Sequence, residues 1–253
     1  MSTHALSDTA VLTGRSLRHI LRSPDTIVTT AVMPVAIMLL FVYVLGGAVD
    51  TGGTSYVDFL LPGILLITVA SGIAYTAYRV FLDVRGGIVD RLRSMPIAPG
   101  SVLWGHVLTS LVANAVSLAL VVGVAVIVGF RSGASVLAWA GVVGILMSYT
   151  LALTWVAVIA GLAAKTIDGA SAFSYPLIFL PFVSSAFAPT DTMPGPVRWF
   201  AENQPVTSLV DAIRALLAQQ PVGASVWVAL AWCAGILVVA WLVAAALFRR
   251  SGR

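Results

Sequence analysis

The sequence predicts an all-α integral membrane protein with six transmembrane helices, for three reasons. Of the 253 residues, 59% are hydrophobic and only 9% are charged, whereas globular domains carry roughly 25% charged residues. The apolar residues occur in runs of 19 to 29, which are too long for the core helices of a soluble domain and long enough to cross a bilayer. The basic residues gather in alternate connections between these runs, as the positive-inside rule predicts for a multi-pass protein.

The chain begins with a segment, residues 1–26, that we expect to form an N-terminal amphipathic helix. Between residues 8 and 22, three arginines share one helical face and three large apolar residues lie opposite: Arg15, Arg18 and Arg22 against Leu17, Ile20 and Leu21. Such a helix suits the membrane interface, with its arginines toward the lipid headgroups. The alternative is a disordered basic tail. A cleaved signal peptide is not expected, because the charged stretch is too long and the next apolar run has the length of a span.

We assign the whole chain, 1–253, to a single transmembrane domain with spans at about 27–47, 57–78, 102–130, 136–164, 170–188 and 224–248. If the N-terminus lies inside, the outer segments hold only three of the 14 basic residues, and the cytoplasmic segments hold the other 11. The three are Arg131, Arg198 and Arg214. This asymmetry predicts that both termini are cytoplasmic.

The longest connection, residues 189–223, precedes the last span on the outer side. Its residues from Val206 to Leu217 have apolar side chains at helical spacing, but a helix of about a dozen residues is too short to cross the bilayer. We therefore expect outer re-entrant or interfacial helices between spans five and six. The alternative is a small lid that only seals the protein.

The connection between spans two and three, residues 79–101, holds the main candidate site. Gly86-Gly87 interrupts the chain, and an apolar stripe at i, i+4 and i+7 follows, with charged residues off the stripe and a proline at its end. These features predict a cytoplasmic coupling helix that docks on a partner outside the bilayer, although a charged loop that only sets orientation is an equal alternative. The candidate coupling residues are Arg85, Gly86, Gly87, Ile88, Asp90, Arg91, Leu92, Arg93, Met95 and Pro96.

Catalytic motifs are absent from the sequence. It has no G-x-x-x-x-G-K-[ST] loop for nucleotide phosphates and no cluster of residues with the spacing of metal ligands, so we expect no enzymatic activity, no catalytic residue, no metal site and no cofactor in this chain. The basic residues flank membrane segments rather than forming a nucleic-acid surface. Apart from Asp58 at the edge of the second span, no charged residue lies inside the spans as bounded above. The absence of charge from the middle of the spans argues against a proton-coupled carrier and indicates that energy enters from a partner.

Five polar residues within or near the spans are candidates for a substrate path. Ser71, Tyr75 and Tyr78 share one face of the second span, and His106 and Asn114 share one face of the third. Hydrogen bonds between helices are the alternative explanation for these residues, and we favour it.

Three stretches resemble permease subunits of ABC-2 type exporters, most closely those of the daunorubicin/doxorubicin-resistance (DrrB-like) kind. They are FLDVRGGIVDRLRSMPIAPGSVLWG at 81–105, SSAFAPTDTMPGPVRWFAENQPVTSLVDAIRALL at 184–217, and FLLPGILLITVASG at 59–72. The resemblance implies a bacterial cell-membrane protein that works with two copies of a cytoplasmic ABC ATPase, which bind ATP and Mg²⁺. It also implies a second permease subunit, either an identical copy or a close relative.

The resemblance implies export of a drug or other hydrophobic compound, and two alternatives remain. One is an ABC-2 exporter of a lipid or glycan. The other belongs to a different class, a non-transporting membrane sensor or assembly factor. A neighbouring ATPase gene would favour export over the second alternative.

Overall fold

The structure is a computed structural model that describes residues 24–46, 55–87 and 99–250. The expected coupling helix, from Ile88 to Met95, lies outside the described residues. So does the expected N-terminal segment 1–26, except for residues 24–26, which begin α2. The described residues form helices and the turns that connect them, and these ranges contain no strand. The first half contains α2 (Pro24–Leu40), a π-helical turn η1 (Phe41–Leu45), α3 (Tyr56–Arg85), α5 (Pro99–Val128) and α6 (Val136–Ala163). The second half contains α7 (Ile167–Ala172), α8 (Ser174–Phe179), η2 (Leu180–Val183), η3 (Thr190–Thr192), α9 (Gly195–Asn203), α10 (Pro205–Leu217) and α11 (Ser225–Arg250).

Four of the described helices are long and apolar enough to cross a membrane: α3, α5, α6 and α11. The segments expected as the first and fifth spans instead form shorter apolar helices, Thr30–Val44 and Ile167–Val183. In the fifth, Pro176 lies in α8 and Pro181 lies at the start of η2. Because proline lacks a backbone N–H, the two prolines favour several short helices over one continuous helix.

The second expected span, 57–78, is longer in the structure, where α3 runs from Tyr56 to Arg85. The additional turns continue the apolar pattern with Val80 and Phe81, both buried. The helix therefore carries Asp58 in its first turn and Arg85 in its last. Charged residues within long helices of this kind are tolerated near the ends, where their side chains reach water or headgroups.

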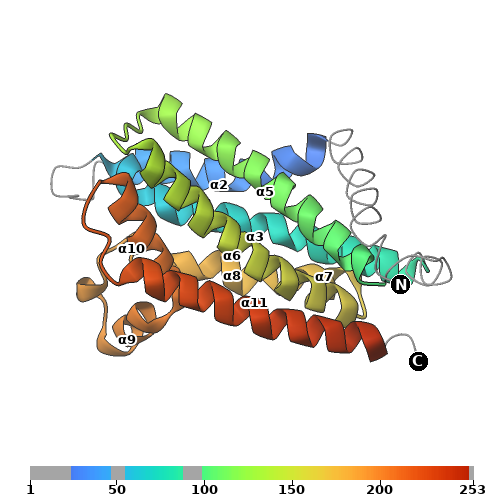
Figure 1. The fold of residues 1–253 in the computed structure, drawn as a ribbon. Coiled ribbons are helices and arrows are strands. Elements are labelled where there is room, and N and C mark those ends of the chain that lie inside the picture. The colour runs from blue at the N-terminus through green and yellow to red at the C-terminus, as the bar shows by residue number, and fades with distance from the viewer. Residues whose placement is uncertain (1–23, 47–54, 88–98, 251–253) are drawn as a thin grey trace.

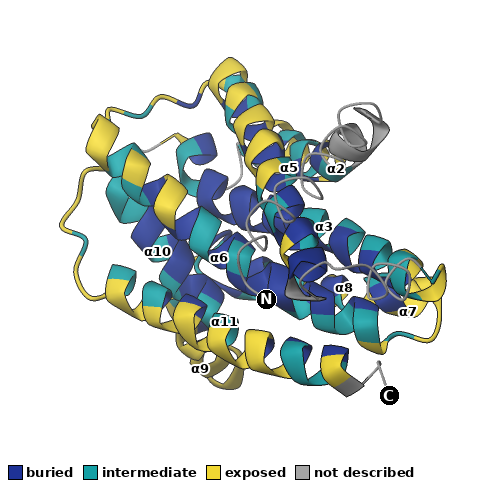
Figure 2. Cartoon of the chain, turned by 45° about the vertical axis from the view of Figure 1, so that its right-hand side comes forward, coloured by how far each residue is buried: buried dark blue, intermediate teal, exposed yellow. Residues whose placement is uncertain are grey.

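The α3 helix is the centre of the bundle. It packs against α2, α5, α6, α7, α8 and α10, and Figure 1 shows it running between α5 and α11. Almost every residue from Leu60 to Ala70 is completely buried, as the dark ribbon of α3 in Figure 2 makes visible. Either lipid or protein can cover a helix that is apolar on most of its faces, and for α3 the neighbouring helices provide most of the cover.

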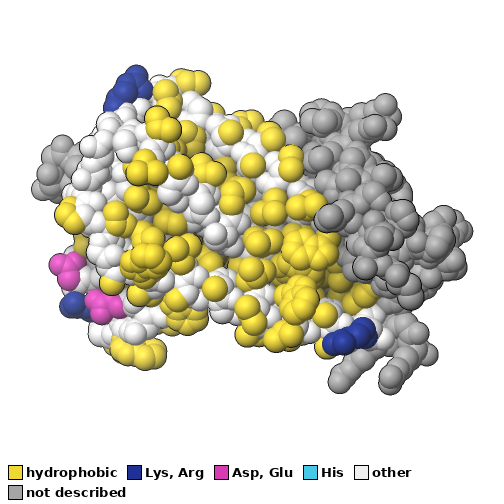
Figure 3. Space-filling view, viewed as in Figure 1, with side chains coloured by type: hydrophobic (Ala, Val, Ile, Leu, Met, Phe, Trp, Pro, Cys, Tyr) yellow, Lys and Arg dark blue, Asp and Glu magenta, His cyan; other side chains and the backbone are white. Residues whose placement is uncertain are grey.

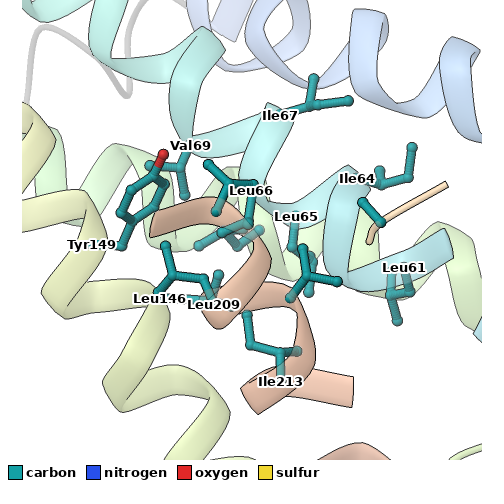
Figure 4. Packing of buried hydrophobic residues seen from close by; sticks show 14 of the residues in the cluster. Leu61, Ile64, Leu65, Leu66, Ile67, Val69, Leu146, Tyr149, Leu209 and Ile213 are labelled. Carbon is teal, nitrogen blue, oxygen red and sulfur yellow. The ribbon is translucent and has the colours of Figure 1, made fainter. Parts of the chain in front are cut away.

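The apolar stripe of α10 packs against protein. Leu209 and Ile213 are completely buried, and Figure 4 shows them beside Leu65, Leu66 and Leu146. The helix contacts α3, α6 and α11. The burial of this stripe, which we expected the membrane interface to provide, is therefore supplied by three other helices.

The outward faces of α5 and α11 carry the large exposed apolar side chains expected on a lipid-facing surface. Ile127 on α5 and Trp227 on α11 are 85% and 73% exposed. In Figure 3 hydrophobic side chains cover the middle of the visible face, while charged side chains of the described residues lie toward its two ends. This belt is the surface that a protein in a bilayer requires.

Candidate functional site

A groove lies over one face of α3, between α2 on one side and α7 and α8 on the other. Its volume is about 440 Å³, within the range of small-molecule sites, roughly 300–1,000 Å³. Ser71, Tyr75 and Tyr78, the candidates from the second span, all line it. The other lining residues are Thr30, Met33, Ala74, Ser171, Ser174, Tyr175 and Ile178.

Aromatic faces and hydroxyl groups line this groove, and none of its lining residues is charged. The Tyr75 and Tyr78 rings lie with centroids 6.0 Å apart and planes inclined by 35°. The Arg79 guanidinium lies 5.9 Å from the centroid of the Tyr75 ring, and its Nη1 donates to the Tyr75 hydroxyl at 3.4 Å. Ser71 donates its hydroxyl proton to the Ile67 carbonyl at 2.9 Å. The groove thus suits an apolar or aromatic molecule that carries few charges.

The helices that border the groove also carry large exposed apolar side chains. On the α2 side, Met33 is 49% exposed and Tyr43, in η1, is 72% exposed. On the α8 side, Tyr175 and Phe179 are 61% and 64% exposed. The groove is therefore bordered by an apolar surface that this single chain leaves uncovered.

Asn114, a candidate from the third span, does not reach the groove. Its Nδ2 donates to the Ser110 carbonyl at 2.9 Å within α5, and the side chain is almost completely buried. Its amide lies against Gly72 of α3 so closely that any Cβ at position 72 would collide with it. Asn114 thus packs between α3 and α5, but its hydrogen bonds to Ser110 stay within α5 and do not join the two helices.

Ser110 is the centre of a polar seam that joins three helices. Thr76 of α3 donates to the Ser110 hydroxyl at 2.9 Å, and the Ser110 and Thr154 hydroxyls lie 3.2 Å apart between α5 and α6. All three residues are buried. Such hydrogen bonds hold helices in register where no water is available to replace them.

His106, the other candidate from the third span, pairs with Asp83. The two side chains join α5 to the last turns of α3, with Nε2 and Oδ2 3.1 Å apart. Nearby in the chain, Arg85 donates from Nη2 to the Ala164 carbonyl after α6, at 3.3 Å. These contacts connect the ends of three helices where the chain enters and leaves residues 88–98.

Only the first three candidate coupling residues are described. The α3 helix ends at Arg85, and the Gly86 N–H donates to the Leu82 carbonyl at 2.7 Å. Gly87 has a φ of +68°, a left-handed conformation that glycine adopts without the strain of a Cβ. The expected interruption at Gly86-Gly87 is therefore present, and the coupling helix itself stays a prediction.

The opposite wall of the groove was not among the candidate residues predicted from the sequence. Ser171, Ser174, Tyr175 and Ile178 follow one another at i, i+3, i+4 and i+7, which is the signal of a shared helical face. The spacing alone does not indicate that this face meets Ser71 and Tyr75, because the two sets lie about a hundred residues apart in the chain. Within the described residues, no group of three or more His, Cys, Asp or Glu is arranged to hold a metal ion.

The chain is similar in sequence to several known ABC transporter proteins. The chain is 27% identical over 217 residues to the daunorubicin resistance ABC transporter permease protein DrrB1 of Streptomyces coeruleorubidus, covering 84% of this chain and 76% of that protein. It is 25% identical over 250 residues to the probable doxorubicin resistance ABC transporter permease protein DrrC of Mycobacterium tuberculosis, covering 97% and 90%. It is also 24% identical to ABC transporter G family member 20 of Dictyostelium discoideum, over 75% of this chain and 26% of that longer protein.

The family model described as "ABC-2 type transporter" matches residues 7–218, which include every described helix except α11. This match covers well over half of the 253 residues. The chain belongs to the ABC-2 type transporter family and is a multi-pass membrane protein.

Proposed function

We propose that this chain is the non-catalytic permease subunit of a bacterial ATP-driven exporter of a drug or other hydrophobic compound. The observation that carries the proposal is the family match over residues 7–218. The relatives named for daunorubicin and doxorubicin resistance support a drug-like substrate. A separate cytoplasmic ATPase would bind ATP and Mg²⁺ and supply the energy.

In this proposal the groove over α3 receives the substrate, and α3 connects it to the ATPase. Tyr78 and Arg85 lie about two turns apart on one helix, so a displacement of the end of α3 moves the α3 wall of the groove relative to the walls from α2, α7 and α8. The Asp83–His106 pair would transmit the same displacement to α5. Residues 88–96 would dock on the ATPase as the coupling helix.

The proposed assembly contains two permease subunits and two ATPase subunits. The exposed Met33, Tyr43, Tyr175 and Phe179 support a second permease, identical or closely related, that covers the open side of the groove. Six membrane crossings with both termini in the cytoplasm complete the proposed topology. In it, α9 and α10 lie at the outer surface and the N-terminal helix lies at the inner one.

A reconstitution experiment tests this function. The tagged permease is purified from native membranes with any ATPase that accompanies it, and the complex is placed in proteoliposomes. ATP-driven uptake of daunorubicin is then followed by its fluorescence. We expect uptake by the complex and none by the permease alone. Tyr175→Ala should reduce uptake, whereas Trp241→Ala, on the outward face of α11, should not.

The outcomes separate the candidate functions. If no ATPase accompanies the permease, the exporter assignment fails and a sensor or assembly factor is favoured. If the complex flips labelled lipids but not daunorubicin, the substrate class is wrong and lipid export replaces drug export. If Tyr175→Ala and Trp241→Ala reduce daunorubicin uptake equally, the groove does not form part of the substrate path.

A further inference from the structure

A second cavity, of about 390 Å³, lies at the opposite end of α3 from Arg85. It is formed where α3 begins, α5 ends and α10 ends, and its charged lining residues are Asp58, Arg131 and Arg214. The apolar lining is Phe59, Phe130 and Leu217, and the remaining residues are Ser132, Gly133, Ala218, Gln219 and Gln220. Because long apolar helices end at this level, the cavity lies at the depth of the lipid headgroups.

The guanidinium of Arg131 has donors available at this cavity. Its Nη1 donates to the carbonyls of Val126 and Phe130, at 2.7 and 2.9 Å. Its Nε and Nη2 have no hydrogen-bond partner, and no carboxylate forms an ion pair with it, among the described residues. An arginine held by one nitrogen and free at two others can bind a phosphate by its remaining N–H groups.

Asp58 places a carboxylate at the same cavity. Its Oδ1 accepts a long hydrogen bond, 3.4 Å, from the backbone N–H of Arg131, and the described residues offer it no ion pair. The cavity therefore presents guanidinium donors and one carboxylate acceptor side by side. A ligand that matches this pattern carries both an anionic phosphate and a cationic amine.

The walls of the cavity are tied together before any ligand binds. Ser132 donates its hydroxyl proton to the Leu217 carbonyl at 3.1 Å, and the Gln219 side chain donates to the Gly133 carbonyl. Gln219 also has a φ of +54°, a left-handed conformation that is uncommon for a residue with a Cβ. The Gln219 and Gln220 N–H groups donate to the Leu216 and Ala215 carbonyls, so this left-handed residue caps the C-terminus of α10 and fixes the end of that helix at the rim of the cavity.

We propose that this cavity binds the phosphoethanolamine headgroup of a membrane phospholipid. The phosphate interacts with Arg131 and the ammonium group with Asp58, while Phe59, Phe130 and Leu217 contact the glycerol and the upper acyl chains. The lipid is a bound component distinct from the substrate in the groove over α3. It joins the start of α3 to the α5–α6 connection and to the end of α10.

Native mass spectrometry of the delipidated full-length protein tests this site. Dioleoyl phosphatidylethanolamine and dioleoyl phosphatidylglycerol are added separately, and the first bound lipid is quantified for each. We expect tighter binding of phosphatidylethanolamine, because phosphatidylglycerol has the phosphate but no amine. Arg131→Gln should weaken phosphatidylethanolamine binding about tenfold, the effect of losing one charge-assisted hydrogen bond.

Two further variants make the test specific. Asp58→Asn keeps the size of the side chain and should abolish the preference for phosphatidylethanolamine over phosphatidylglycerol. Arg198→Gln removes another arginine, which pairs with Glu202 on α9 outside the cavity, and should bind phosphatidylethanolamine as the wild type does. Thermal melts of each variant verify that it is folded. If Arg131→Gln does not fold, the lipid preference of Asp58→Asn tests the proposal by itself.

Three results would overturn the proposal. The first is equal affinity of the wild type for the two lipids. The second is equal weakening by Arg131→Gln and Arg198→Gln. The third is displacement of the lipid by soluble phosphoethanolamine or inorganic phosphate at the same concentration, which would identify a site for a free anion.

Discussion

Replacement of Arg214 by Met tests whether one half-buried guanidinium fastens the 184–217 segment to the start of α3. The Arg214 Nη2 donates to the Ser185 carbonyl at 2.8 Å and to the Phe59 carbonyl at 3.2 Å. The guanidinium also lies 4.2 Å from the centroid of the Phe59 ring. Three segments, α10, the start of α3 and the chain after η2, thus meet at one side chain.

The expected loss of stability follows from these contacts. Each hydrogen bond from a charged group contributes about 1.5–3 kcal/mol, and a partly buried cation–π contact contributes about 1 kcal/mol. Burial opposes this gain, since desolvation lowers the pKa of the Arg214 guanidinium and the nearby Asp211 carboxylate only partly offsets that shift. Met retains the apolar stem but leaves two carbonyls without their donor. We expect a net destabilisation of about 3 kcal/mol.

The assay is thermal unfolding of the purified protein in one detergent, followed by tryptophan fluorescence. A loss of about 3 kcal/mol corresponds to a Tm lower by roughly 6–12 °C, from about 2–4 °C per kcal/mol in domains of this size. The matched control is Arg198→Met on α9, whose exposed side chain pairs with Glu202 at 2.7 Å. Exposed pairs contribute little, so its Tm should not change. A melt of Arg214→Met that coincides with that of the wild type refutes the reasoning.

Three other predictions concern the polar seam, the coupling helix and the topology. Thr76→Val removes the hydrogen bond to Ser110 and should destabilise the protein by about 0.5–1.5 kcal/mol; an unchanged Tm would contradict a stabilising seam. Leu92→Asp should reduce co-purification of the ATPase without changing membrane insertion, and normal ATPase binding and export would exclude the coupling helix. Single cysteines at Ser94 and Thr192 should react with impermeant reagents from opposite sides of the membrane, Ser94 from the cytoplasm. Labelling of both from one side would refute six crossings.

The one-dimensional pattern of the sequence was sufficient to predict the class of the protein and the helices α3, α5, α6 and α11. The length of an apolar run and the 3.6-residue period are local properties that each segment carries alone. The position at which α3 ends is also determined by the local sequence, because Gly86-Gly87 favours the end of a helix. The resemblance to ABC-2 permeases also came from contiguous stretches, and the family match bears it out.

The tertiary structure decided which of the polar residues come together. Ser71 and Tyr75 face a groove completed by Tyr175, whereas Asn114 lies between helices and His106 pairs with Asp83. Spacing within a span indicates that residues share a face, but the neighbour that this face meets depends on how the helices pack.

The contacts of Arg214 with Ser185 and Phe59 and the burial of α10 depend on the same long-range packing. Arg214 and Phe59 are 155 residues apart in the chain, and no local pattern relates them. The apolar stripe of α10 predicts that something covers the helix, and either lipid or protein satisfies that requirement equally well. Only the fold determines that α3, α6 and α11 cover it, because the free energy of burial depends on the area removed from water and not on what removes it.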